Sequence, residues 1–390
     1  MEKGPVSVLV APLDWGLGHA TRCIPIIKEL IYQGARVIIA TSSGQKTLLK
    51  LEFPQLEFLE IPGYDIRYKW GTLLKWTLFF NIPGLLKQIR IENKWLEQIL
   101  LHHKIDAIIS DNRYGLFNSK CFSVFITHQL YIQSGLGSNK KIGSWQLKVG
   151  SWINRKIMKW HFKFISKFSE CWVHDQEGEF SVAGLLSHSP VTPPIQVKYI
   201  GILSRFHHSE KNIEKNSLLI LISGPEPQRT EFENILFKQL VGFPMKTFVV
   251  RGLPGANQSI PFIQDGIKIF NHLSSHELNE LLNSSEFIIA RSGYSTIMDL
   301  LTLRKNAILV PTRGQTEQEY LGQYIHEKKW MYSVSQKNFN LQKAIYAFEK
   351  AELVLPVTPD TKLRNVVEDF LRGINSRYSN HAEENKGVKY

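Results

Sequence analysis

Short apolar runs alternate with longer amphipathic segments along most of the chain. The short runs are rich in β-branched residues, as strands are, and the longer segments have the apolar spacing of helices. In the first half the expected strands are 6–10, 36–40, 56–61, 106–110, 123–127, 171–174 and 197–200. In the second half they are 218–222, 246–250, 267–270, 286–290 and 306–310, with helices at 231–241, 275–282, 295–303 and 318–328. This alternation predicts an α/β fold in which helices cover parallel sheets.

The alternation is interrupted once, by a polar, charge-rich stretch at 204–217 that has neither period. We expect this stretch to be a linker between two domains. The first domain is then 1–203 and the second 218–375, and the polar end of the chain, 376–390, is expected to be disordered. Two domains agree with a length of 390 residues, which exceeds what one core usually supports.

Composition restricts the partners and the compartment. A formal net charge of +12 favours an anionic partner, such as a phosphorylated ligand, an acidic lipid surface or nucleic acid. No recognised nucleic-acid module is present, so nucleic acid is not expected. Three scattered cysteines suit a reducing cytosol, and we see neither a signal-peptide pattern nor an apolar run of about 18 residues that could span a membrane. A cytoplasmic location is expected.

The most informative segment lies between the first expected strand and the first expected helix. It spans Asp14–Arg22 and reads DWGLGHATR. A glycine turn between a strand and a helix brings backbone N–H groups close to a ligand at the positive end of the helix dipole. Ligands of α/β sheets bind at the carboxyl ends of the strands, so Gly16, Gly18 and His19 are candidates for ligand contact.

The same segment argues against a dehydrogenase. The dinucleotide fingerprint G-x-G-x-x-G requires a third glycine where Thr21 stands. The second expected strand ends in Thr41-Ser42-Ser43, without the acidic residue that binds the ribose of NAD. We therefore expect no cofactor.

Three polar loops follow strands of the second half and are expected at the carboxyl edge of one sheet. Glycine and small hydroxyl residues at a helix start can surround a phosphate with backbone donors, and arginine adds positive charge. An acidic residue one turn into the helix is placed to accept hydrogen bonds from ribose hydroxyls, and amide groups suit the hydroxyls of a sugar. Together the loops predict a nucleotide site. Its candidate residues are Gly16 and Gly18 of the first loop, with Ser223, Gly224, Arg229, Arg291, Ser292, Gly293, Ser295, Thr296, Asp299, Thr316, Glu317, Gln318 and Glu319.

The order strand, RSGYST, helix, strand, Pro311, TEQ, helix resembles the donor-binding domain of nucleotide-sugar glycosyltransferases with the GT-B architecture. The chain is also similar to the bacterial peptidoglycan N-acetylglucosaminyltransferases, whose glycine-rich, histidine-terminated loop resembles residues 16–19. The resemblance extends by element order from about Val6 to Lys328. It implies two Rossmann-like domains that face each other across a cleft.

Matched position by position, the resemblance implies roles for individual residues. Ser292, Gly293, Ser295 and Thr296 face the diphosphate of the donor, and Gln318, with Glu319 beside it, contacts the donor sugar. Asp299 stands where the family usually has a ribose-binding glutamate. The loop 224–229 departs from the family's glycine-serine turn, and the first loop begins with Asp14-Trp15 rather than with small residues. These departures concern the identity of the donor and the acceptor.

Relatives of this kind invert the anomeric carbon, because an acceptor hydroxyl attacks as the nucleotide diphosphate leaves. The reaction needs a general base and positive potential around the diphosphate. His19, with an ordinary pKa of about 6.5, is the expected base, and Asp14 either replaces it or orients it. Arg291, Arg229 and the helix start at Thr296 are expected to stabilise the leaving group. No metal is expected, since the chain has no D-x-D cluster to hold Mg²⁺.

Each of these residues also has a structural alternative. His19 could cap the helix that follows it, Asp14 could form the turn, the serines and threonines could cap a helix, and the arginines could form surface salt bridges. The stretch 111–114 also follows a strand and is a further candidate for lining the acceptor side.

A strongly basic segment, Asn139–Ser169, contains no acidic residue. On a helix its apolar positions form one face and its cations the other, with tryptophan among the cations. One explanation is attachment to an anionic membrane that carries a lipid-linked acceptor, and the other is an ordinary packed helix with a solvated basic face. A second basic-aromatic stretch lies at 68–80. The candidate membrane-side and acceptor-side residues are Trp145, Trp152, Arg155, Lys159, Trp160 and Lys163.

The sequence thus predicts a metal-independent, inverting glycosyltransferase. It would move a sugar from a nucleotide-diphosphate donor, such as UDP-GlcNAc, to a lipid-linked or cell-envelope glycan at the inner face of the membrane. A nucleotide-sugar epimerase or hydrolase on the same fold is an alternative, which paired carboxylates or further histidines in the cleft would favour. A non-catalytic nucleotide-sugar-binding protein is another.

Overall fold

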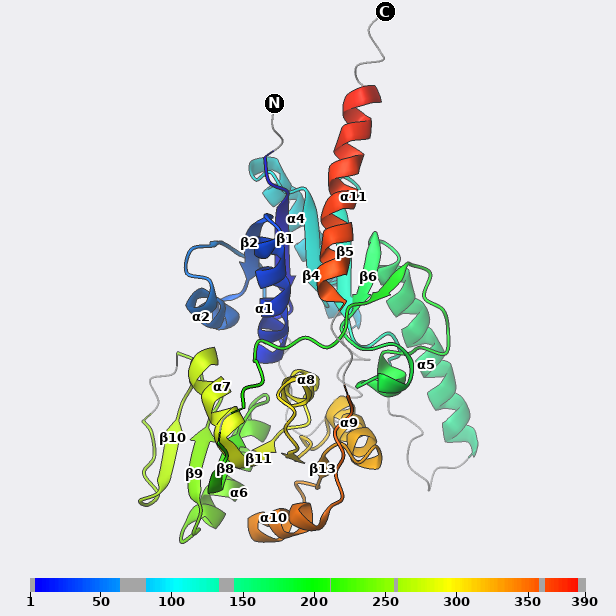
Figure 1. Ribbon diagram of the computed structural model, residues 1–390. Coiled ribbons are helices and arrows are strands. Elements are labelled where there is room, and N and C mark those ends of the chain that lie inside the picture. Colours follow the sequence, from blue (N-terminus) through cyan, green and yellow to red (C-terminus); the bar gives the residue numbers. More distant parts are fainter. Residues whose placement is uncertain are drawn as a thin grey trace, which may run out of the picture. The chain divides into compact units, whose positions relative to one another are not determined.

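The computed structural model describes residues 4–63, 82–132, 144–210, 212–255, 259–357 and 362–384. The chain divides into two compact units (Figure 1). The first unit is drawn from 1–46, 53–202 and 359–390, and the second from 47–52 and 203–358.

The first unit contains a seven-stranded parallel sheet with the order β3-β2-β1-β4-β5-β6-β7. Its strands are β1 (Ser7–Pro12), β2 (Arg36–Thr41), β3 (Glu57–Glu60), β4 (Ala107–Asp111), β5 (Phe122–Thr127), β6 (Glu170–Val173) and β7 (Val197–Tyr199). Its helices are α1 (Leu17–Tyr32), α4 (Ile82–His102), α5 (Ser144–Ile165) and α11 (Leu363–Glu384), with short 3₁₀ turns at Gly178–Phe180 and Gly184–Leu186. The helix α2 (Ser43–Glu52) begins in the first unit, and its residues 47–52 are assigned to the second.

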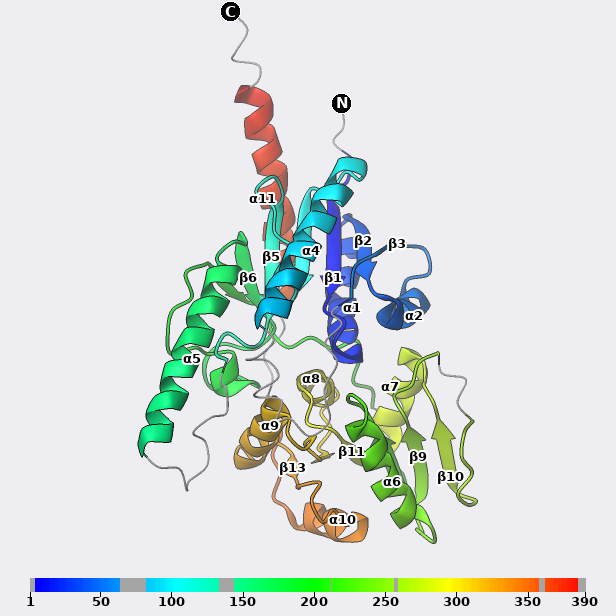
Figure 2. The same ribbon diagram turned by 180° about the vertical axis from the view of Figure 1, so that it is seen from behind.

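Helices cover both faces of this sheet. Figure 1 shows α1 and α11 on one face, and Figure 2 shows α4 and α5 on the other. Because both faces are covered, the inner strands are largely apolar, and every residue of β1 is buried. On the α4 side, Leu96 packs with Leu9 and Ile38, and on the α5 side Ile165 packs with Phe125. These apolar layers fix the strand ends that carry the polar loops.

The C-terminal helix α11 belongs to the first unit, which differs from the expected second domain at 218–375. Phe370 packs edge-on against Trp172, with ring centroids 5.3 Å apart, and Gln33 Nε2 donates to the Arg364 carbonyl at 3.0 Å. The helix also continues to Glu384, so 376–384 is helical where disorder was expected. An apolar stripe at helical spacing explains the packing. The stripe comprises Leu363, Val367, Phe370, Leu371 and Ile374.

The second unit contains a six-stranded parallel sheet with the order β10-β9-β8-β11-β12-β13. Its strands are β8 (Glu214–Leu221), β9 (Lys246–Val250), β10 (Ile267–Phe270), β11 (Ser285–Ala290), β12 (Ile308–Leu309) and β13 (Tyr332–Ser333). Its helices are α6 (Gln228–Leu240), α7 (Ser275–Ser284), α8 (Tyr294–Thr302), α9 (Thr316–Glu327) and α10 (Leu341–Lys350). Phe232 and Leu236 of α6 and Leu341 of α10 share one apolar core with β8 and β9.

The expected α/β fold with two parallel sheets is confirmed. The predicted linker, 204–217, is too long at its end, because β8 begins at Glu214, which pairs with Ser285 of β11. The short strand β13 and the helix α10 were not expected from the sequence. Within the described ranges, no helix is both long enough and apolar enough to cross a membrane.

Candidate active site

In both sheets the order in which strands are added reverses beside an inner strand, and we call this place the switch point of the sheet. In the first unit the chain adds β2 and β3 on one side of β1 and then crosses to β4 on the other side. In the second unit it adds β9 and β10 beside β8 and then crosses to β11. The loops after two such neighbouring strands diverge, and ligands of open α/β sheets bind there. The loops that the sequence singled out follow β1, β8 and β11, and so lie at these two points.

The turn after β1 is held in one conformation. Gly16 has φ +79°, a value that favours glycine, and it is the N-cap residue of α1. The buried Gln45 donates from Nε2 to the carbonyls of Leu13 at 2.6 Å and Gly16 at 2.8 Å, and Thr21 Oγ1 donates to the Gly18 carbonyl at 3.0 Å. No side chain caps α1 in this described segment, so His19 is not a helix cap.

His19 lies beside a carboxylate from the neighbouring strand. Its Nδ1 is 2.9 Å from Oδ2 of Asp111, the last residue of β4. Arg22, one turn further along α1, donates to both oxygens of Asp111, from Nε at 2.9 Å and from Nη2 at 2.5 Å. Asp111 is fully buried, whereas the His19 side chain is 15% exposed. The site thus places one partly accessible imidazole over a buried ion pair.

The charges of this cluster follow from burial and from each other. Burial alone would raise the pKa of Asp111, but Arg22 and His19 hold it at about 2. Burial and the Arg22 cation lower the pKa of His19 below its ordinary value, although Asp111 opposes this. At neutral pH the carboxylate is therefore ionised and the imidazole is uncharged.

Asp14 lies in an ion pair with an arginine. Its Oδ1 lies 3.6 Å from Nη2 of the buried Arg113, which also pairs with Glu92 at 2.7 Å. A Cβ at Gly63 would lie 2.9 Å from Asp14 Oδ2, so the carboxylate packs closely against the backbone there. The residue that orients His19 is Asp111, which the sequence indicated only as part of a stretch on the acceptor side. Its signal was its position at the end of β4, next to β1.

Two further histidines follow the next strands of this edge. His128 comes directly after β5 and His174 directly after β6, and their ring centroids are 5.1 Å apart. Both are buried, and burial, Arg22, His128 and His19 lower the pKa of His174 far below its ordinary value. Their burial makes them unsuited to direct contact with a substrate. They therefore do not favour the epimerase or hydrolase alternative.

The second unit presents the start of α8 at its switch point. Gly293 is the N-cap residue of α8, and no described side chain caps this helix. Ser295 and Thr296 are half-buried in its first turn. Gly224, which follows β8 with φ +111°, is exposed, and a Cβ there would lie 3.7 Å from Thr312 Oγ1. An uncapped helix start beside two glycine-containing loops is suited to an anion.

Arg291 and Ser292 have structural roles here instead of the expected phosphate contacts. Arg291 is 1% exposed, and it donates to the carbonyls of Val310 and Gln228 at 3.2 and 3.0 Å and to Gln336 Oε1 at 2.8 Å. Its guanidinium also lies over the Phe232 ring, at 4.1 Å. The Ser292 hydroxyl donates to the Gln318 carbonyl at 2.7 Å. These bonds join the three loops to one another.

Arg229 is also held inside the unit. It donates to Glu226 at 2.5 Å and to the buried Glu233 at 2.8 Å. Glu233 also accepts from a second buried arginine, Arg251, at 2.8 Å. Arg229, Arg251 and Arg291 are thus three buried cations near the loops that follow β8, β9 and β11. Glu226, which is 54% exposed, pairs with Arg229 only, and the Glu231 carboxylate acts on Arg291. The arginines expected to stabilise the leaving group are thus buried in this unit.

Asp299 lies in the second turn of α8 and is half-buried. Ser204 Oγ donates to its Oδ1 at 2.6 Å. Burial raises the pKa of Asp299 to about 7, although Arg205 and Ser204 oppose the rise. The carboxyl group is therefore close to half-ionised at neutral pH, and its charge responds to what binds beside it.

The loop after β12 is organised by Gln318 and Glu319. Gln318 accepts from the backbone N–H of Thr312 at 3.0 Å and donates to Gln315 at 2.6 Å, and Glu319 accepts from the Gly314 N–H at 2.9 Å. Thr316 and Glu317 begin α9 and are half-buried. These side chains shape the loop, so any sugar contact would be made from a fixed frame.

The basic helix α5 has the two faces that the sequence predicted. Met158, Phe164 and Ile165 are buried, and Trp160 is half-buried. The outer face exposes Arg155, Lys156, Lys159 and Lys163, with Trp152 54% exposed among them, and Lys167 is exposed in the turn after the helix. The side chain of Trp145 and the stretch 68–80 lie outside the described residues.

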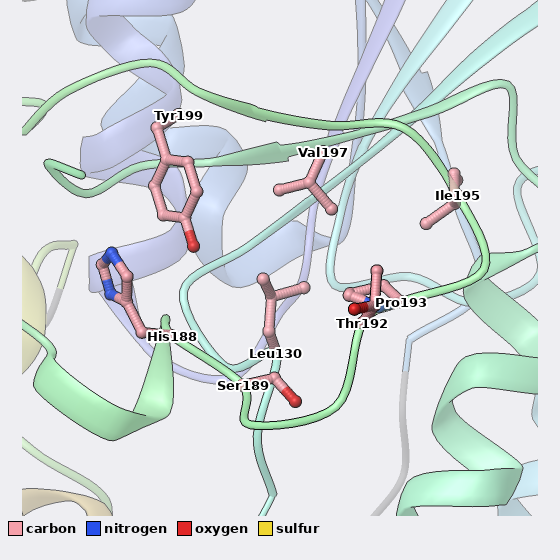
Figure 3. Close-up of a pocket in the computed structure, with 8 residues that line it drawn as sticks. All are labelled: Leu130, His188, Ser189, Thr192, Pro193, Ile195, Val197 and Tyr199. Atoms are coloured by element: carbon pink, nitrogen blue, oxygen red, sulfur yellow. The ribbon is translucent and has the colours of Figure 1, made fainter. Parts of the chain in front are cut away.

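A pocket of about 270 Å³ lies beside β7. Figure 3 shows Val197 and Leu130 near its middle, with Ile195 and Pro193 toward one end. At the other end the His188 ring stacks on Tyr199, with centroids 4.9 Å apart. The lining is mixed, with Leu130, Pro193, Ile195 and Val197 beside polar residues, and the sequence did not indicate it because its residues come from separate segments.

Comparison with known proteins agrees with this arrangement. Residues 257–372 match the glycosyltransferase family 28 C-terminal domain. Over 332 residues the chain is 23% identical to an uncharacterized glycosyltransferase from Methanosarcina acetivorans, and the match covers 83% of this chain and 84% of the relative.

Solved structures share the fold at low sequence identity. The glycosyltransferase of kitacinnamycin has a TM-score of 0.60 at 11% identity, covering 98% of this chain and 99% of that chain. A UDP-glucosyltransferase from Polygonum tinctorium has a TM-score of 0.60 at 12% identity, covering 96% and 100%. Phytolacca americana UGT2, complexed with UDP-2-fluoro-glucose and pterostilbene, has a TM-score of 0.59 at 13% identity, covering 96% and 95%. The chain thus has the GT-B fold of glycosyltransferases, and its residues 257–372 match the family 28 C-terminal domain.

The interior position of Arg291 generates a prediction. Arg291→Lys should lower the free energy of unfolding by about 1–3 kcal/mol, because one ammonium group cannot serve three separate acceptors. The measurement is urea unfolding, with Arg313→Lys, in the exposed part of the loop after β12, as the matched control. Unchanged stability combined with weaker diphosphate binding would return Arg291 to the role of a phosphate ligand.

Proposed function

We propose that this glycosyltransferase moves a sugar from a UDP-linked donor to a hydroxyl group of a lipid-linked or cell-envelope glycan, with inversion and with His19 as the general base. The observation that carries the proposal is the contact between His19 and Asp111 at the switch point of the first sheet, 2.9 Å long. The anion-suited start of α8 at the switch point of the second sheet supports it.

The base chemistry follows from the proton positions. When Nδ1 carries its proton and donates it to Asp111, Nε2 has a free lone pair that can accept a proton from the acceptor hydroxyl. The ionised Asp111 then stabilises the imidazolium that forms, as a carboxylate does beside a catalytic histidine. Departure of the nucleotide diphosphate completes the displacement, and buried cations of the second unit would stabilise its charge.

The donor assignment is supported by two features of the second unit. The first turn of α8, with Gly293, Ser295 and Thr296, offers backbone donors to a diphosphate. Asp299, one turn further, can accept from ribose hydroxyls. UDP is proposed as the nucleotide because two of the solved structures that share the fold concern a UDP-glucosyltransferase and a complex with UDP-2-fluoro-glucose. The sugar itself, with GlcNAc as the sequence suggested, remains a proposal.

The acceptor assignment is supported by two features of the first unit. The exposed cations and Trp152 on α5 suit the headgroup layer of an anionic membrane. The pocket beside β7, with Leu130, Ile195 and Val197 in its lining, offers a place for an apolar part of an acceptor. Peripheral contact with the membrane would bring the first unit to a lipid-linked glycan.

Donor binding provides the first prediction. UDP should raise the melting temperature of the protein by mass action, whereas NAD should not. Asp299→Ala should weaken UDP binding by about 1–3 kcal/mol, because the ribose hydroxyls lose a buried acceptor. UDP affinity should also fall as the pH drops through about 7, since protonated Asp299 accepts fewer hydrogen bonds. Isothermal titration calorimetry measures all of these affinities.

The control for this prediction is Asp369→Ala, which removes an exposed carboxylate from α11. An Asp299→Ala variant that binds UDP as tightly as the unaltered protein would exclude the residue from the site. Stabilisation by NAD instead of UDP would exclude the donor class.

Catalysis provides the second prediction. His19→Gln should lower kcat by about 10²–10⁴-fold, the usual contribution of a general base. Asp111→Asn should lower kcat more than Asp14→Asn does, because Asp111 orients the imidazole. The acidic limb of kcat/KM should lie below pH ~6.5, since the pKa of His19 is lowered and the base form exists above that pKa.

The assay is release of UDP from a panel of UDP-sugars with extracted lipid-linked acceptors. A greater loss in Asp14→Asn than in Asp111→Asn would reverse the assignment of the orienting carboxylate. Full activity of His19→Gln would remove the base.

Membrane contact provides the third prediction. The double variant Lys159→Gln, Lys163→Gln should bind vesicles of mixed anionic and neutral phospholipid more weakly by about 2 kcal/mol, at about 1 kcal/mol for each cation. The control pair is Lys343→Gln, Lys350→Gln, two exposed cations of α10 in the second unit. Cosedimentation measures binding, and equal binding of both double variants, or equal binding to purely neutral vesicles, would contradict the proposal.

A further inference from the structure

Nδ1 of His19 has two neighbours that require opposite proton positions. Asp111 Oδ2 lies 2.9 Å away and Arg22 Nη2 lies 2.5 Å away. The carboxylate can only accept, so it favours a proton on Nδ1. The guanidinium can only donate, so it favours a bare Nδ1. The state of the imidazole therefore depends on how Arg22 and Asp111 share their hydrogen bonds.

Arg22 is committed mainly to Asp111. It binds both carboxylate oxygens, at 2.9 Å from Nε and 2.5 Å from Nη2, and it is 4% exposed. Such a two-point guanidinium–carboxylate pair is among the strongest hydrogen-bonded pairs in proteins. Arg22 follows His19 by three residues in α1, so one turn of helix places both side chains at the same carboxylate.

The other groups that act on His19 come from several elements. Asp111 belongs to β4, and the Cys23 thiol of α1 lies 4.0 Å from Asp111 Oδ2, with its pKa raised well above the ordinary value by burial and by Asp111. His128 and His174 follow β5 and β6. The Cys23 thiol is thus uncharged at neutral pH, as is His174, whose pKa burial lowers. Of the described groups that act on His19, Arg22 is the permanent cation.

We propose that Arg22 is a positioning residue that holds Asp111 through both oxygens and thereby keeps His19 uncharged and ready to accept a proton at Nε2, even in mildly acidic conditions. A carboxylate alone beside a histidine favours the imidazolium. With Arg22 bound to it, the carboxylate is already neutralised and gives the imidazolium less support. His19 becomes a weaker base that remains deprotonated over a wider pH range. This inference rests on the proposed function of His19 as the base.

The test is an NMR titration of the full chain with ¹⁵N- and ¹³C-labelled histidine, in which the His19 signals are identified by their loss in His19→Gln. In the unaltered protein we expect a titration midpoint below pH ~6.5, and a neutral form protonated at Nδ1. In Arg22→Met the midpoint should rise by about one pH unit or more, because Asp111 then acts without its cation. The acidic limb of kcat/KM should move upward with it.

The matched control is Lys28→Met, which removes an exposed cation from the same helix and should leave the midpoint unchanged. A midpoint in Arg22→Met at or below that of the unaltered protein would overturn the proposal. If Arg22→Met does not fold, Arg22→Gln, which keeps hydrogen-bond donors without the charge, is expected to show the same rise. A midpoint above pH ~6.5 in the unaltered protein would overturn the proposal without any variant.

The titration separates this inference from the proposed function. If His19→Gln keeps full transferase activity, the base assignment fails while the titration still reports the action of Arg22. If His19→Gln is inactive but the His19 titration midpoint is the same in Arg22→Met as in the unaltered protein, the base assignment stands and the proposed role of Arg22 is wrong.

Discussion

The parallel direction of the strands is the constraint on which both candidate sites depend. Parallel strands bring all their carboxyl ends to one edge of a sheet, and a change of strand order separates two neighbouring loops there. In the first unit this constraint places Asp111, which ends β4, beside the helix that carries His19. In the second unit it places the loop after β8 beside the start of α8. Residues far apart in sequence therefore meet without any local motif.

The buried charged side chains are paired differently in the two units, and each arrangement suits a different part of the proposed reaction. In the first unit one buried cation, Arg22, balances one buried anion, Asp111, so the neighbouring imidazole remains neutral. In the second unit three arginines, Arg229, Arg251 and Arg291, are buried near the loops that follow β8, β9 and β11, and the start of α8 has no side-chain cap. A neutral base and a positive field for a leaving diphosphate are the two electrostatic requirements of sugar transfer.

The sequence predicted the parts of this molecule that depend on local pattern. Apolar runs gave the strands of both sheets, and glycine with small polar residues marked the loops. The sequence marked 111–114 as following a strand, but it did not pair Asp111 with His19, because 92 residues separate them and the strand order that brings them together has no local signal. The burial of Arg291 could not be predicted either, because the sequence around an arginine is the same whether its side chain binds a phosphate or a backbone carbonyl. The assignment of α11 to the first unit was also missed, because an apolar stripe on a helix does not tell which of two sheets the helix covers.

The most direct test of the account is a crystal structure of the full chain with bound UDP. The account predicts the diphosphate at the first turn of α8, beside Gly293 and Thr296, with the ribose hydroxyls on Asp299. A nucleotide bound instead at the start of α1, against Gly16 and His19, would contradict the assignment of the donor to the second unit and of the base to the first.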